Sequence, residues 1–156
     1  MQLIIDEEQA TANSRKTAIR AATMLMRSME LWRRDRLDPH NVLIILAVIS
    51  ITSEKLMRTQ LDPKYHALSN YLPLEQLQGC NVASIAAATG LNRETVRRRV
   101  QHLIGSGSLI RTDSGEIALP PGKVNEDSAL ELVRRQLEAV TRFANDSLRD
   151  GVLLVR

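Results

Sequence analysis

The sequence predicts a mainly α-helical fold, in which a helix–turn–helix with a short two-stranded wing is flanked by long N- and C-terminal helices. Three observations predict it: apolar residues at helical spacing on both sides of a glycine turn, a hairpin pattern directly after them, and heptad-like apolar stripes near both chain ends. We expect one compact domain overall, composed of a helical frame and dimerisation region at 1–75, the winged helix–turn–helix at 76–121, and a C-terminal dimerisation helix with its tail at 122–156.

A first long helix is predicted from about Glu8 to Arg36. Apolar residues recur three and four positions apart in it and form a seam for another helix, namely Ala18, Ala22, Leu25, Met29 and Trp32. Asp38 and Pro39 then begin a second helix, with proline in the first turn, where its missing amide costs nothing. This helix is expected to end at Asp62-Pro63. It is apolar on nearly every side over 42–51, so we expect other elements to surround it.

That apolar run has only ten residues, about half of a membrane span, and no membrane partner is expected. The acidic start at 6–8 differs from a secretion signal. A single cysteine, Cys80, excludes an intramolecular disulfide and fits a reducing cytoplasm, where we expect the protein to act.

The helix pair is predicted by its packing residues. Ile85 and Ala86 face inward on the first helix, and Gly90 supplies a left-handed turn that a side chain would obstruct. Asn92 is a suitable N-cap for the second helix, predicted at 92–106. The inward stripe of this second helix consists of Val96, Val100 and Leu103.

The opposite face of the second helix is charged. At about 100° per residue, the side chains that project from it are Arg93, Glu94, Arg97, Arg98 and Gln101. Residues 92–104 contain four arginines and one glutamate, so this segment has a net charge of +3, equal to the net charge of the whole chain. An apolar inner face with a basic outer face is typical of a helix that lies in the major groove of DNA.

A hairpin follows the helix pair. Residues 109–112 are predicted to form one strand, 113–116 the turn and 117–119 the returning strand. Arg111, at the base of this wing, is placed to meet a DNA phosphate.

The segment 90–98 resembles the recognition helix of catabolite activator and Fnr-type regulators, in which an Arg-Glu-Thr-Val-x-Arg run enters the major groove. By that resemblance Arg93, Glu94 and Arg98 would read base edges, and Thr95 would touch the DNA backbone. The chemistry agrees, because arginine pairs with guanine O6 and N7 and glutamate accepts a hydrogen bond from cytosine N4. The resemblance covers roughly 40 residues if the wing is included.

The sequence departs from those regulators in two respects. Nothing in it resembles their β-rich cyclic-nucleotide domain. Arg99 stands where they usually have an apolar residue, so its stem is expected to pack while its head reaches a phosphate. The flanking helices are similar in layout to the helical dimerisation frame of MarR-type winged-helix regulators.

The C-terminal helix is predicted to start at the acidic, capped segment 125–127 and to stop at Asp150-Gly151, before an apolar tail at 152–155. Its stripe consists of Leu130, Val133, Leu137, Val140, Ala144 and Leu148. Because both terminal helices carry such stripes, we expect a homodimer. The alternative is that the stripes pack on the apolar second helix of the same chain.

Other chemistry finds little support. Without a basic neighbour or a second cysteine, Cys80 is expected to be an inert buried thiol and not a redox sensor. His40, His66 and His102 lack ligand spacing, so no metal ion is expected, and no cofactor. The sequence has no phosphate-binding glycine loop and no nucleophile motif, and we expect no enzymatic activity.

These features together predict a homodimeric, sequence-specific regulator of transcription that binds double-stranded DNA. Three consecutive arginines on a solvated face favour this function. One alternative is a protein-interaction module that uses the same fold without DNA. Another is a repressor that responds to a small molecule bound between the helical frame and the winged helix, with an effector that the residues do not identify.

Overall fold

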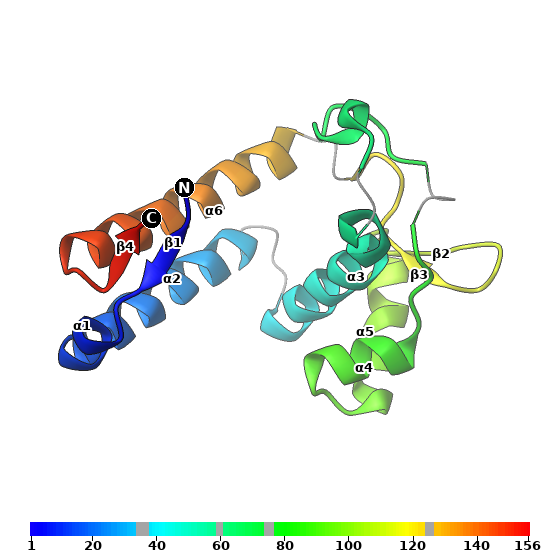
Figure 1. Cartoon of the computed structure of the whole chain (residues 1–156). Helices are drawn as coiled ribbons and strands as arrows, with labels where there is room; N and C mark the ends of the chain where they lie inside the picture. The colour runs from blue at the N-terminus through cyan, green and yellow to red at the C-terminus, as the bar shows by residue number, and fades with distance from the viewer. Residues whose placement is uncertain (34–37, 59–60, 74–76, 124–126) are drawn as a thin grey trace. The chain divides into compact units, whose positions relative to one another are not determined.

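The computed structural model describes residues 1–33, 38–58, 61–73, 77–123 and 127–156. The fold is mainly helical, as predicted, and the described residues also form two small antiparallel sheets of two strands each. The chain divides into two compact units (Figure 1). The terminal unit comprises Met1–Arg36 and Glu131–Arg156, and the central unit comprises Leu37–Leu130. This division differs from the three predicted segments, since the second long helix groups with the helix pair.

The terminal unit is built from both ends of the chain. Its elements are β1 (Leu3–Ile5), α1 (Glu7–Ala12), α2 (Ser14–Arg33), all but the first residues of α6 (Asp127–Arg149), and β4 (Leu153–Val155). The observed start of α6 agrees with the acidic segment predicted to begin it, although 124–126 lie outside the described residues.

The prediction of one unbroken first helix is wrong, because the chain leaves the helix at Asn13, between α1 and α2. The Asn13 side-chain amide donates to the backbone oxygen of Gln9 at 3.1 Å and to its side-chain oxygen at 3.3 Å. A short amide side chain that bonds to nearby backbone competes with the helical pattern. Asp6 caps α1 by accepting from the Gln9 amide at 2.9 Å. The predicted last turn, at 34–36, lies outside the described residues.

The apolar tail is a strand, which the sequence analysis did not predict. β4 pairs antiparallel with β1, with Leu3 opposite Val155 and Ile5 opposite Leu153. Beyond the strands, Gln2 and Arg156 exchange two backbone hydrogen bonds of 2.7 and 2.9 Å. A three-residue strand is not stable alone, and here the partner strand lies at the other end of the chain. No local sequence pattern therefore predicts the pairing.

α2 and α6 run antiparallel in the terminal unit. Near the start of α2, the Lys16 ammonium lies 2.6 Å from the carboxylate of Asp150, just past the end of α6. Arg20 forms an ion pair with the same carboxylate and donates to the backbone oxygen of Asp146 at 2.9 Å. The inner faces of the two helices are therefore joined by charged side chains.

Most residues of the predicted apolar stripes of α2 and α6 are exposed, whereas Met29, Trp32, Ala144 and Leu148 are half-buried. Leu25 and Leu137 are 60% and 62% exposed, and Val133 and Val140 are exposed as well. An arginine that lines the space between the helices follows two positions after each of Leu25, Val133 and Val140. Two positions correspond to about 200° around a helix, so these three side chains lie on the side away from that space. Among the described residues of this unit only Ser147 and Val152 are buried.

The central unit contains the main core. Its elements are α3 (Pro39–Arg58), the short 3-10 helix η1 (Pro63–Tyr65), α4 (Val82–Thr89), α5 (Arg93–Gly105), β2 (Ile110–Arg111) and β3 (Ile117–Ala118). α3 packs against α4, α5 and β3. The largest side chains enclosed there are Ile44, Ile85, Leu103, Leu109 and Ile117. None of the helices in the described ranges combines the length and the apolarity that a membrane crossing requires.

α3 begins where the sequence predicts. Asp38 accepts hydrogen bonds from two backbone amides of the first turn, at 2.9 and 3.3 Å. The described part of the helix runs to Arg58, residues 59–60 lie outside the described residues, and Leu61 and Asp62 are not helical. The expectation that other elements surround it holds for one face and is wrong for the other, since Leu43 and Leu46 are exposed. The fully enclosed side chains of α3 are Val42, Ile44 and Val48.

Candidate nucleic-acid interface

α4 and the turn after it form as the sequence predicts. The Asn81 side chain accepts from the Ser84 amide at 2.9 Å, and the Ser84 hydroxyl lies 3.0 Å from the Asn81 amide, so the two residues cap α4 reciprocally. Ile85 and Ala86 are buried. Gly90 has φ +70°, a left-handed conformation that glycine adopts without steric cost, and it redirects the chain toward α5.

α5 is the helix predicted at 92–106, with bounds that agree to within a residue. The Asn92 side chain accepts from the Glu94 amide at 2.8 Å and so caps the first turn. The inward stripe is confirmed, since the buried residues of the helix are Val96, Val100 and Leu103. This packing orients the opposite face of α5 toward solvent.

The solvent face of α5 carries a chain of paired side chains. Glu94 accepts two hydrogen bonds from Arg97, at 2.8 and 2.6 Å. Arg97 also donates to the Gln101 side chain at 3.2 Å. The hydrogen bond from Arg97 lowers the pKa of the Glu94 carboxyl, and the same bond raises the pKa of Arg97. This pairing is not among the predictions above, although a glutamate and an arginine three residues apart on a helix favour it.

Two other arginines on the same face of α5 are not held by hydrogen bonds as Arg97 is. Arg98 is 69% exposed, and its Nε lies 3.9 Å from Glu94, which is an ion-pair distance and longer than a hydrogen bond. Arg93 has no hydrogen bond or ion pair with any residue in the described part of the chain. Thr95 is half-buried beside them. The structure therefore places Arg93, Glu94, Arg97, Arg98 and Gln101 on one exposed face, with Arg93 and Arg98 the freest cations among them.

Arg99 has a different role from the one predicted. Its guanidinium donates to the Asp38 carboxylate at 2.6 Å and to the Asn41 side-chain oxygen at 3.0 Å, which joins α5 to the start of α3. Burial opposes ionisation of Asp38, but hydrogen bonds from Arg99 and from the Asn41 and His40 amides hold its pKa below the ordinary value. The Arg99 side chain is 30% exposed and its guanidinium is bonded to α3, so the structure gives it a partner within the protein in place of the predicted phosphate.

The hairpin after α5 contains β2 and β3, which pair with Ile110 opposite Ala118 and Arg111 opposite Ile117. Both strands are shorter than predicted. The turn between them contains Gly115 at φ +83°. The exposed Arg111 guanidinium donates to the Gly115 carbonyl at 2.7 Å, so it lies across the hairpin.

The backbone of Cys80 is hydrogen-bonded to the hairpin. Its carbonyl accepts from the Ile117 amide at 2.8 Å, which places the residues before α4 beside β3. The thiol is buried, and burial raises its pKa, which agrees with the low thiolate character expected of an inert cysteine. No cluster of three or more potential metal ligands occurs among the residues that the structure describes.

Comparison of the chain with protein-family models, with curated proteins and with solved structures finds no match.

Proposed function

We propose that this chain is a sequence-specific, double-stranded DNA-binding regulator of transcription, in which α4 and α5 form a helix–turn–helix and the hairpin β2–β3 forms its wing. α5 is the recognition helix in this proposal. One observation carries it: a helix buried by an apolar stripe on one side exposes Arg93, Arg97 and Arg98 on the other.

The roles of the side chains follow from their pairing. Arg93 and Arg98 have forked donors to offer guanine, because neither is held by a hydrogen bond within α5. Glu94 and Arg97 hold each other, so they form a pre-arranged acceptor and donor pair beside these two cations. Thr95 and Arg111 would contact the DNA backbone, with Arg111 giving up its bond to Gly115 for a phosphate.

We also propose that the protein acts as a homodimer through its terminal unit. The apolar stripes of α2 and α6 are exposed, and a unit with two buried residues among those described has too little interior to be stable by itself. A second copy would cover the stripes with stripes of the same kind and place two recognition helices on one duplex.

The test has two steps. A random duplex pool is first selected on the wild-type protein to obtain its preferred site, and affinity is then measured at matched ionic strength on that site and on a scrambled duplex. Replacing Arg98 by alanine is expected to cost about 1–3 kcal/mol on the selected site and to relax the preference at one G·C pair.

Arg58→Ala is a matched control outside the proposed dimer surface. Arg58 is 79% exposed and pairs with Glu54, four residues before it on α3, in the same order as Glu94 and Arg98 on α5. Its replacement is expected to leave both affinities unchanged. Equal losses for Arg98→Ala and Arg58→Ala would mean that bulk charge, not α5, determines the binding.

A protein-interaction module is the second candidate function, because Glu94 neutralises part of the basic face. The same experiment separates the two. If the wild-type protein binds every duplex no better than about 10⁻⁴ M at physiological salt, it has only non-specific affinity, and the interaction module replaces our proposal.

A further inference from the structure

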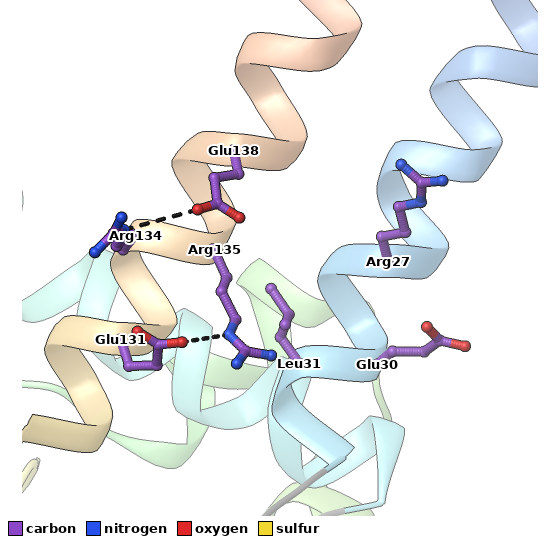
Figure 2. A pocket seen from close by; sticks show the side chains of 7 residues that line it. All are labelled: Arg27, Glu30, Leu31, Glu131, Arg134, Arg135 and Glu138. Carbon is purple, nitrogen blue, oxygen red and sulfur yellow. Dashed lines mark hydrogen bonds and ion pairs between the residues drawn. The ribbon is translucent and has the colours of Figure 1, made fainter.

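The space between α2 and α6 contains two hollows, both lined within the terminal unit. The larger has a volume of about 580 Å³ and is shown in Figure 2. Its charged residues on α6 are paired, since Glu131 lies 2.5 Å from Arg135 and Arg134 lies 3.7 Å from Glu138. The smaller has a volume of about 130 Å³, and Arg27 lines both.

The smaller hollow has unbalanced positive charge. Arg20, Arg27 and Arg142 line it, with Asp146 as the carboxylate among its lining residues. Asp146 is engaged by Arg20 at 3.8 Å and by Arg149 at 3.1 Å. Arg27 and Arg142 have no hydrogen bond or ion pair with any described residue. Both side chains are exposed, and two guanidinium groups from facing helices therefore line this hollow without a carboxylate partner among the described residues.

The rest of the lining is largely apolar. Met24 contributes from α2, and Ala139 and Phe143 contribute from α6. A hollow with free guanidinium groups and an apolar wall suits a ligand that has a carboxylate at one end and a hydrocarbon group at the other. An engineered apolar cavity of about 150 Å³ holds one benzene molecule, so the hydrocarbon part is at most about one ring in size.

We propose that this hollow binds a small organic carboxylate. Arg27 and Arg142 hold the carboxylate by charge-assisted hydrogen bonds, and the hydrocarbon group lies against Phe143 and Met24. None of these residues belongs to α5 or to the hairpin, and the stripe proposed for the dimer lies on the outer faces of the two helices. The site thus extends the proposed function by an effector-binding surface, and its test does not require DNA.

The chain offers a direct probe, because Phe143 is its single phenylalanine. Protein grown with 4-fluorophenylalanine will give one ¹⁹F resonance from the hollow itself, and benzoate is the ligand titrated. We expect a saturable shift of this resonance with benzoate, and binding at least about tenfold weaker with neutral benzyl alcohol. Sulfate serves as an anion without a hydrocarbon group and is expected to bind more weakly than benzoate.

Single substitutions test whether Arg27 and Arg142 bind the carboxylate. Arg27→Gln and Arg142→Gln are each expected to weaken benzoate binding at least about tenfold, because each removes one charge-assisted contact. Arg15→Gln makes the same change in net charge at an exposed α2 position outside the hollow, and it is expected to bind like wild type. The proposal is overturned if benzoate leaves the resonance unmoved at millimolar concentration, if benzyl alcohol or sulfate binds as well as benzoate, or if both hollow variants bind as the Arg15 variant does.

Discussion

Adjacent arginines in this protein have different roles, and the difference depends on which side of α5 each one occupies. Arg98 points to solvent with a distant ion-pair partner, whereas the next residue, Arg99, is bonded to Asp38 and Asn41 on α3. A rotation of about 100° separates the two side chains. At the residue scale, a run of like charges is therefore not a single functional feature.

The bond between Asp38 and Arg99 predicts a dependence of stability on pH. Asn is also a good N-cap, so Asp38→Asn keeps the cap of α3 and removes the charge. Because the folded-state pKa of Asp38 is lowered, its carboxylate stabilises the fold above the unfolded-state pKa, and this contribution disappears as pH falls through the folded-state value.

We therefore expect the variant to be less stable than wild type at pH 7, and the difference to vanish in strongly acidic solution. Urea unfolding at several pH values measures it. A difference that stays constant down to pH 2 would contradict the assigned role of the charge.

Glu94 yields a second prediction at the residue scale. Replacing it by alanine frees Arg97 from its two hydrogen bonds and removes a negative charge from the solvent face of α5. Affinity for scrambled duplex is expected to rise or stay the same, while discrimination at one base pair of the selected site falls. The opposite sign on scrambled DNA would show that Glu94 positions the helix and does not read a base.

At the scale of elements, the helix pair depends on local backbone chemistry. The caps at Asn81 and Asn92 satisfy amides at the starts of α4 and α5, and Gly90 provides the change of direction between them. These features lie within residues 81–92, so the local sequence is sufficient to specify them and no contact between distant residues is needed. The strands β1 and β4 differ, because their pairing is entirely long-range.

Gly90→Ala tests the turn with a control in the same chain. A methyl group at Gly90 would meet no other atom, so the expected loss, about 1–2 kcal/mol of unfolding free energy, comes from the left-handed backbone alone. Gly105 also has open space at its Cβ position but lies at the helical end of α5, and Gly105→Ala is expected to be neutral or stabilising. Chemical denaturation compares the two variants, and equal effects would mean that the turn at Gly90 is not strained by a side chain.

At the scale of the whole molecule, apolar surface is unevenly distributed. The central unit encloses a core from α3, α4, α5 and the hairpin, while α2 and α6 expose their apolar stripes. Large exposed apolar patches are unusual in monomeric proteins, and the exposed stripes are the basis of the dimer proposal.

The dimer proposal predicts that charges in these stripes separate the copies. Leu25→Glu together with Leu137→Glu is expected to shift the protein from dimer to monomer at micromolar concentration, as measured by light scattering. The control is Met57→Glu with Tyr71→Glu, which makes the same charge change at exposed apolar residues of the central unit and should leave the mass unchanged. A wild-type protein that is already monomeric at this concentration would refute the dimer.

The sequence by itself determined the helix pair, the Asn92 cap, the glycine turn and the division of α5 into a buried and a charged face, because these depend on spacing and on neighbouring residues. It also placed the hairpin and the two terminal stripes. Only the tertiary structure decided that Arg99 serves α3, that the chain ends pair as β1 and β4, and that the stripes of α2 and α6 face outward while charged residues line the space between them. Those outcomes depend on contacts between distant parts of the chain, which a pattern of neighbouring residues does not contain.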